Sequence, residues 1–230
     1  MTILLNCDLG ESYGDRRIGM DAQVMPHIHQ ANIACGFHGG DPLTMRATLV
    51  LAADHGVTAG AHPSYPDLEG FGRRSMRMAP QELVAALHYQ VAALEGMARN
   101  LGVRLAHIKP HGALYNDMMR EADIRAAVIE AVASYHQPLV LVMQATQHTE
   151  LHREEAESAG VSLQFEAFAD RCYDDDGALL SRDRPGAVHS RERMLDQVRQ
   201  LLAERTVTTV SGRTLTLHAQ TLCVHGDNPE

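Results

Sequence analysis

The sequence predicts a single α/β domain over residues 1–230, folded as a seven-stranded (β/α) barrel. Seven short apolar segments with strand character alternate, for the most part, with segments whose apolar residues repeat every three to four positions. Strands that alternate with helices form mainly parallel sheets, and 230 residues suit one domain of barrel size. An open doubly wound sheet is the competing architecture, but the chain contains neither GxGxxG nor GxxxxGK[ST].

The start of the chain is expected to form two strands and a capped helix. Apolar residues over 3–8 and 30–36 indicate short strands, each followed by a turn that contains glycine. Asp41 then provides an N-cap, and Pro42 occupies the favoured first helical position. We expect the helix that they open to end at Gly56, because glycine commonly follows the last helical residue.

The middle of the chain continues this alternation. The helix over 83–101 is the clearest element, because its apolar residues keep helical spacing along its whole length. It lies between a third strand, 57–61, and a fourth strand that includes Lys109. Pro110 has no N–H group to continue a sheet, so we expect that strand to end there and the chain to turn.

The rest of the chain completes the barrel, with no linker, low-complexity segment or repeat to divide it. Two threonine-rich runs flank Ser211 and Gly212, which is typical of a small β-hairpin. The remaining elements are expected as helices over 124–135, 147–158 and 191–205, strands over 139–142, 163–168 and 221–224, and a hairpin of 206–210 with 214–217.

Composition limits the class of function. The hydrophobic content of 45% and charged content of 21% are ordinary for a soluble globular protein. A net charge of −9 without a basic patch argues against nucleic-acid binding, and an aromatic content of 4% without tryptophan argues against base stacking. No run is apolar enough to span a membrane, the N-terminus lacks a signal-peptide pattern, and four distant cysteines indicate free thiols. We therefore expect a cytoplasmic protein with no nucleic-acid or membrane partner.

Lys109 is the only lysine of the chain and lies between His107 and His111. All other cationic side chains are arginines, so a single ammonium is retained at this position. Lysine can serve as a point charge or proton donor and can shift its pKa when it is desolvated, which arginine does poorly. This segment alone does not distinguish a functional lysine from a chance one beside two structural histidines.

The carboxyl ends of the expected strands carry most of the candidate site residues. In a parallel barrel these ends open on one side of the sheet, where such folds place their sites. Almost every strand ends in an ionisable side chain, whereas the strand starts carry mostly polar turn residues. This coincidence predicts one common site for Asp8, Glu11, His38, His62, Lys109, His111, Asp170, Arg171, His225 and Asp227.

Two chemistries fit these residues, and their spacing does not choose between them. In the first, Asp8 and two histidines from His38, His62 and His111 hold a divalent ion that activates water for amide or ester hydrolysis. In the second no metal takes part. Asp8 or Asp227 is then the general base, Lys109 stabilises a developing oxyanion, and the histidines orient them.

Seven motifs in a fixed order make the chain resemble the LamB/YcsF family, which provides the A subunit of the bacterial ATP-dependent 5-oxoprolinase. The resemblance runs from Leu5 to Asp227, nearly the whole chain, and several ordered motifs are far more specific than any one of them. The matching segments are 5–11, 31–41, 60–67, 70–73, 109–115, 168–171 and 224–227.

The resemblance implies a barrel of the glycoside hydrolase/deacetylase type and a reaction. The implied reaction cleaves the lactam of 5-oxo-L-proline to L-glutamate, with ATP as co-substrate and with subunits B and C as partners. The chain has no Walker-type loop, so the ATP site cannot be placed and part of the nucleotide chemistry is assigned to the partners. A homo-oligomer is compatible with the sequence.

Within that reaction the residues receive expected roles. Lys109 and Arg73 are expected to neutralise phosphate or carboxylate charge, while Asp8 or Asp227 activates water. We expect Lys109→Met to abolish turnover and to leave the fold intact. The catalytic set is Asp8, Glu11, His38, His62, Lys109, His111 and Asp227, and the substrate-binding set is Asn6, Asn32, Arg73, Asp170, Arg171 and His225.

Two other functions fit the same barrel. One is a stand-alone, metal-dependent, deacetylase-like amide hydrolase, and the other is a substrate-binding subunit whose partners do the chemistry. The chain also departs from the family at one point, since family members usually continue past the motif that ends at Asp227 into a final helix. A last strand without its covering helix exposes apolar surface, so we expect either that the chain is shortened or that another subunit covers that face.

Overall fold

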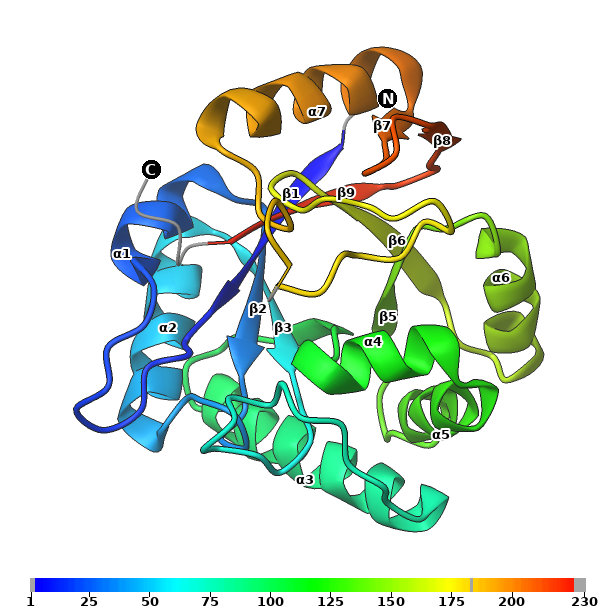
Figure 1. Cartoon of the computed structure of the whole chain (residues 1–230). Coiled ribbons are helices and arrows are strands. Elements are labelled where there is room, and N and C mark those ends of the chain that lie inside the picture. Colours follow the sequence, from blue (N-terminus) through cyan, green and yellow to red (C-terminus); the bar gives the residue numbers. More distant parts are fainter. Residues whose placement is uncertain (1–2, 183, 226–230) are drawn as a thin grey trace.

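Seven parallel strands close into a barrel in the computed structural model, which describes residues 3–182 and 184–225. The strands follow one another around the barrel in chain order, and β9 pairs with β1 to close it (Figure 1). This confirms the predicted seven-stranded α/β barrel. The strands are β1 (Leu4–Leu9), β2 (Gln30–Ala34), β3 (Thr58–His62), β4 (Leu105–Ile108), β5 (Val140–Gln144), β6 (Leu163–Phe168) and β9 (Thr221–His225).

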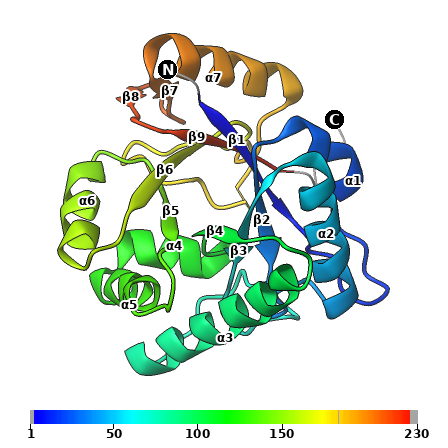
Figure 2. The ribbon, with the colours of Figure 1, turned by 180° about the vertical axis from the view of Figure 1, so that it is seen from behind.

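Helices surround the barrel, as the two opposite views of Figures 1 and 2 show. The predicted caps of α2 are present: the Asp41 side chain accepts a hydrogen bond from the Thr44 N–H, and Gly56 ends the helix with a φ of 66°. The helices are α1 (Asp21–Val24), the 3-10 helix η1 (Met25–His27), α2 (Pro42–His55), α3 (Pro80–Arg99), α4 (Gly112–Arg120), α5 (Ala122–Ala133), α6 (Thr149–Ser158) and α7 (Arg191–Glu204).

Helix α4 was not predicted, and it follows directly after β4. Pro110 does end the strand, but the chain continues from Gly112 as a helix instead of a turn. The helix forms because Ala113, Leu114 and Met118 lie on one face and are buried there. The predicted hairpin is confirmed as β7 (Thr206–Thr208) with β8 (Thr214–Thr216), an antiparallel pair outside the barrel.

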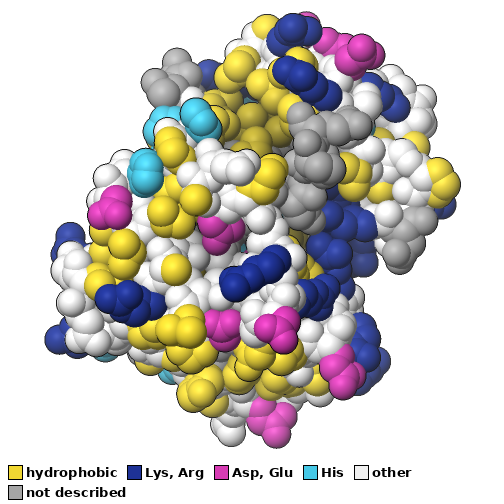
Figure 3. Space-filling model, turned by 90° about the vertical axis from the view of Figure 1, so that its left-hand side faces the viewer, with side chains coloured by type: hydrophobic (Ala, Val, Ile, Leu, Met, Phe, Trp, Pro, Cys, Tyr) yellow, Lys and Arg dark blue, Asp and Glu magenta, His cyan; other side chains and the backbone are white. Residues whose placement is uncertain are grey.

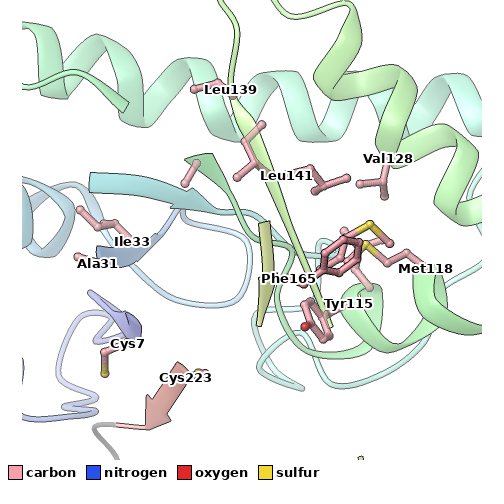
Figure 4. Close-up of a cluster of buried hydrophobic side chains, with 14 of the residues drawn as sticks. Cys7, Ala31, Ile33, Tyr115, Met118, Val128, Leu139, Leu141, Phe165 and Cys223 are labelled. Atoms are coloured by element: carbon pink, nitrogen blue, oxygen red, sulfur yellow. The ribbon is translucent and has the colours of Figure 1, made fainter. Parts of the chain in front are cut away.

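The main hydrophobic core lies between the outer face of the barrel and the helices. Successive residues of a strand point to opposite faces of the sheet, so every second residue packs outward. Ile33, Leu141 and Phe165 from the strands belong to one buried cluster with Met118 and Val128 from α4 and α5 (Figure 4).

The inside of the barrel is polar. Asn32 lies beside Gly60 in the strand register, and Gly60 lies beside His107. Glu166 of β6 pairs in register with Thr221 of β9. These polar side chains are almost fully buried and are linked by hydrogen bonds across the barrel. A polar interior of this kind holds side chains in fixed positions, because each buried group needs its partner.

The last strand is well packed over most of its length. Thr221, Leu222 and Cys223 are buried, whereas Val224 and His225 at its carboxyl end are only partly buried. Asp227, and the expectation about a covering helix after it, lie outside the described residues.

The surface carries arginine as its only strongly basic side chain, because Lys109 is buried. Figure 3 shows the side on which α1 and α2 lie, where basic side chains form a larger group at one edge and are scattered elsewhere, and hydrophobic side chains form separate groups. Over the described ranges, no helix combines the length and the apolar character needed to cross a membrane.

Candidate active site

A cavity of about 350 Å³ opens at the carboxyl ends of the barrel strands. Residues from β1, β3 and β9 reach it, among them Asp8, His62 and His225. Phe168 and Lys109 line it from β6 and from the end of β4. This is the side of the barrel on which the sequence predicts a site.

The structure brings most of the candidate residues to this cavity. Those that line it are Asp8, Glu11, His62, Arg73, Lys109, His111, Arg171 and His225. His38 stacks on the His111 ring, with centroids 3.7 Å apart. Three further candidates are buried and contact residues that line the cavity: Asn6, Asn32 and Asp170. Asn6 accepts a hydrogen bond from Lys109, and Asn32 donates one to Asp8. Asp170 accepts a hydrogen bond from His225 Nδ1 at 2.9 Å.

Five buried residues and the partly buried Asp8 form an amine cluster, which we define as Asn6, Asp8, Asn32, Lys109, Glu166 and Cys223. Lys109 Nζ lies 2.9 Å from Asp8 Oδ1 and 3.0 Å from Glu166 Oε2. It also donates to Asn6 Oδ1 at 3.3 Å and to Cys223 Sγ at 3.2 Å. An ammonium has three N–H donors, so four acceptors saturate it within the protein.

The two asparagines of the amine cluster position its carboxylates. Asn32 Nδ2 donates to Asp8 Oδ1 at 2.7 Å and to Asn6 Oδ1 at 2.8 Å, while its Oδ1 accepts from His107 Nε2. Asn6 Nδ2 donates to Glu166 Oε2 at 3.2 Å. Neither amide lines the cavity. Their predicted effect on substrate would therefore pass through Asp8 and Lys109.

Charge is fixed on both members of the Asp8–Lys109 pair. Burial by itself raises the pKa of Asp8, but the attraction of His62 and Lys109 outweighs it and holds the pKa well below its usual range. Burial lowers the pKa of Lys109, and Asp8, Cys223 and Glu166 together reverse this and raise it well above its usual value. Lys109 is therefore an ammonium beside a carboxylate at neutral pH, and it provides a permanent positive charge.

Four further residues form an imidazole cluster, which we define as Glu11, His38, His62 and His111. Glu11 Oε1 lies 3.4 Å from His38 Nε2 and 3.3 Å from His111 Nδ1. His111 Nδ1 lies 3.0 Å from His62 Nε2. Asp8 joins the two clusters, because its Oδ2 lies 3.4 Å from His62 Nε2 while its Oδ1 binds Lys109.

Backbone carbonyls orient two of the imidazoles. His62 Nδ1 donates to the Lys109 carbonyl oxygen at 2.6 Å, and His111 Nε2 donates to the Phe71 carbonyl oxygen at 2.9 Å. Burial is the main reason why the pKa values of His38 and His111 lie well below the ordinary histidine value. Both of these rings are thus neutral at pH 7.

Local sequence explains how these side chains come together. A side chain at Gly39 would place its Cβ 2.5 Å from the Glu11 carbonyl oxygen, so only glycine lets the loop after β2 lie against Glu11. A Cβ at Gly60 would lie 2.1 Å from His107 Nε2, so glycine opens the barrel interior for that ring. Phe71 adopts a left-handed φ of 56°, and this unusual conformation directs its carbonyl at His111.

Four arginines line the cavity: Arg73, Arg120, Arg171 and Arg182. The guanidinium of Arg171 donates to the carbonyl oxygens of Leu180 and Ala187, so it also holds the segment that follows β6. Burial lowers the pKa of Arg171 to about 10, which leaves it protonated at neutral pH.

Sequence reasoning missed Arg120 and Arg182, because Arg120 lies on the unpredicted α4 and Arg182 lies in irregular chain. Glu166 and His107 were also missed, although a signal was present. Glu166 is an acid inside an apolar strand, on the same face as Gln164 and Phe168. Assigning every second strand residue to the barrel interior would have found it.

Comparisons with known proteins show the family and the fold of the chain. The model of the LamB/YcsF family matches residues 3–230. The 5-oxoprolinase A subunit 2 from Pseudomonas putida is 54% identical over 227 residues, which cover 98% of this chain and 88% of the relative. The 5-oxoprolinase A subunit from Chromohalobacter salexigens is 52% identical over 228 residues, 99% of this chain and 91% of the relative. The crystal structure of a lactam utilization protein from Thermus thermophilus matches with a TM-score of 0.89 and 39% identity, covering 98% and 90% of the two chains.

Proposed function

Because this chain belongs to the LamB/YcsF family, we propose that it is the A subunit of an ATP-dependent 5-oxoprolinase. In this proposal the enzyme hydrolyses the lactam of 5-oxo-L-proline to L-glutamate in the cytoplasm, converts ATP to ADP and phosphate, and requires subunits B and C. The observation that carries it is the Lys109 ammonium, held against Asp8 at the base of a cavity that four arginines line.

The charge of the cavity supports an anionic substrate. Both the carboxylate of 5-oxoproline and the phosphates of ATP carry negative charge, and guanidinium groups bind such oxygens in pairs of hydrogen bonds. A volume of about 350 Å³ lies within the range of small-molecule sites and exceeds what a five-membered lactam fills.

The chemistry needs activation of a poor electrophile. A five-membered lactam is an unstrained amide, and transfer of a phosphoryl group to its oxygen makes the ring carbon reactive toward water. Water then adds to that carbon, and the ring C–N bond breaks as the nitrogen takes a proton, which leaves an acyl phosphate. A second water molecule hydrolyses the acyl phosphate to a carboxylate and phosphate. Lys109 supplies fixed positive charge for the phosphate on the lactam oxygen, and Asp8 accepts a proton from the attacking water.

Reconstitution tests this function. The purified chain is combined with subunits B and C, and glutamate release from 5-oxoproline is measured with and without ATP. We expect release only with ATP and all three subunits, and we expect Asp8→Asn to reduce it by at least about 100-fold. The matched control is Asp196→Asn on the exposed face of α7, which should leave release unchanged. Equal release without this chain, or full activity of Asp8→Asn, would contradict the proposal.

A second function has one observation in its favour. The imidazole cluster places three histidines and a carboxylate together, which suits a metal-dependent amide hydrolase that needs no ATP. The same assay separates the two functions, because such an enzyme would release product from this chain alone and would stop when a chelator is added.

A further inference from the structure

We propose that the imidazole cluster is a binding site for one divalent first-row transition-metal ion. Its ligands are Nε2 of His38, Nε2 of His62, Nδ1 of His111 and Oε1 of Glu11. The inference does not depend on lactam hydrolysis. It also differs from the sequence-based hypothesis, which used Asp8 as the carboxylate ligand, because here Asp8 Oδ1 binds Lys109 and Asn32.

The ring protons of His62 and His111 fix the directions of the remaining lone pairs. His62 Nδ1 and His111 Nε2 both face carbonyl oxygens, which only accept, so these two nitrogens carry the ring protons. The other two nitrogens, His62 Nε2 and His111 Nδ1, face each other at 3.0 Å, and each is an acceptor when its ring carries that one proton. Two acceptors at this distance repel each other unless a cation lies between them.

A single proton does not satisfy the whole cluster. A proton shared by His62 and His111 would serve that pair alone. Within the described part of the chain, Glu11 Oε1 and both ring nitrogens of His38 are buried and make no hydrogen bond. Buried polar atoms are rarely left without a partner, so these atoms indicate a ligand that contacts all four residues at once.

Distances within the cluster suit such an ion. Metal–ligand bonds of about 2.0–2.2 Å place adjacent ligand atoms about 3 Å apart and opposite ones about 4 Å apart. The adjacent pairs here are 3.0, 3.3 and 3.4 Å apart. Each of the four residues offers one ligand atom that lies within 4.8 Å of those of the other three. Small ring rotations close the remaining difference.

The surroundings resemble the outer shell of a metal site. Histidines that bind metals usually donate their other ring N–H to a carbonyl or carboxylate, which fixes the ring and its tautomer. His62 and His111 do this with the carbonyls of Lys109 and Phe71. The unusual backbone conformation of Phe71 gives the latter carbonyl its direction. Glu11, His62 and His111 also line the cavity, so an ion has a path from solvent.

The donor set defines the class of metal. Mg²⁺ and Ca²⁺ prefer oxygen ligands, whereas imidazole suits zinc, iron, cobalt and nickel. Three imidazoles and one carboxylate therefore select a transition metal. An ion here would also lie beside Asp8, whose Oδ2 is 3.4 Å from His62 Nε2.

Cobalt binding to the untagged full chain tests this site. After treatment with a chelator and dialysis, Co²⁺ is titrated, and visible absorption and elemental analysis report affinity and stoichiometry. We expect one Co²⁺ per chain, and we expect His111→Gln or His38→Gln to weaken binding by at least about 100-fold. The matched control is His152→Gln, which replaces a buried histidine of α6 outside the cluster and should leave binding unchanged.

A second measurement guards against variants that do not fold. Co²⁺ should raise the thermal unfolding midpoint of the wild type and of His152→Gln but not that of His111→Gln, whose folded state is checked by circular dichroism. The inference is wrong if the wild type binds no stoichiometric Co²⁺, or if the cluster variants bind as the wild type does. Neither readout uses ATP or 5-oxoproline, so failure here is distinct from failure of the proposed activity.

Discussion

The amine cluster and the imidazole cluster lie side by side at the same end of the barrel, yet their polar atoms are satisfied differently. In the amine cluster every N–H of Lys109 has an acceptor, and Asn6 and Asn32 bind the carboxylates. In the imidazole cluster two acceptor nitrogens face each other, and Glu11 Oε1 has no hydrogen-bond donor among the described residues. The protein itself supplies acceptors for the whole Lys109 ammonium, although Glu166 Oε1 makes no hydrogen bond among the described residues. The imidazole cluster instead gathers acceptor atoms without a cation among them.

This difference predicts opposite responses to mutation. Removing a partner from a completed network leaves a buried charge behind and costs stability. Removing one imidazole from a set of converging acceptors relieves repulsion between them. Such a variant should therefore lose ligand binding more than it loses folding stability. Asp8 belongs to the first group but contacts His62 of the second, and it links stability to the candidate chemistry.

The largest effect is expected for Lys109→Met, which should lower the free energy of unfolding by about 3–5 kcal/mol. Asp8 and Glu166 would then be buried without a counter-charge. This prediction differs from the sequence-based expectation of an intact fold, which did not consider the buried carboxylates that contact Lys109. Urea unfolding followed by circular dichroism measures the change.

A double variant sharpens this result. Lys109→Met combined with Glu166→Gln removes one of the two uncompensated charges, so it should recover part of the lost stability. It should not recover glutamate release, since the ammonium is still missing. If the single variant is as stable as the wild type, the buried Asp8 and Glu166 carboxylates do not depend on the charge of Lys109, and the prediction is wrong.

The next effect concerns pH and the Asp8 carboxylate. Asp8→Asn should lower the free energy of unfolding by about 1–3 kcal/mol at neutral pH. The folded-state pKa of Asp8 is depressed, so its contribution is present above the unfolded pKa of about 3.9 and is lost as pH falls through the lower folded value. The difference between wild type and variant should therefore stay constant from about pH 5 to 9 and shrink below about pH 4.

Lys109 sets the other limit of that window. Its folded-state pKa is raised, so its contribution is present below the unfolded value of about 10.4 and is lost only as pH rises through the higher folded value. Unfolding curves recorded at several pH values check both limits. A stability difference that changes between pH 6 and 8 would show that another group governs it.

The site residues at the carboxyl ends of the strands were predictable from sequence, because parallel strands all end on one side of the barrel. Apolar runs that stop at Asp8, His62 and Lys109 placed these residues near one another without any knowledge of register. Caps such as Asp41 and Gly56 were equally local, since each acts within one turn of its own helix.

The contacts inside the barrel were not predicted, although Asn6 and Asn32 were named as candidates, because these contacts depend on closure of the barrel. Asn6 meets Cys223 only because β9 pairs with β1, and Glu166 meets Thr221 only because β9 also pairs with β6. The sequence indicates that an acid lies within β6, but not which side chain it faces across the barrel. The separation of the polar residues into two clusters, with Asp8 between them, likewise follows from distances that no spacing motif contains.

The smallest effect is expected for Gly39→Ala, which disturbs Glu11 in the imidazole cluster and leaves the amine cluster unchanged. Gly39→Ala would bring a methyl group to 2.5 Å from the Glu11 carbonyl oxygen, so the loop or Glu11 must move. We expect a stability loss of about 1–3 kcal/mol and Co²⁺ affinity about tenfold lower, because Glu11 is displaced from the three imidazoles. The matched control is Gly96→Ala in α3, where the added methyl meets no atom within 4 Å. Alanine there should raise stability by about 0.5–1 kcal/mol and leave Co²⁺ binding unchanged. Equal Co²⁺ affinity in both variants would mean that Glu11 does not belong with the imidazoles, and the contrast between the two clusters would then rest on the histidines alone.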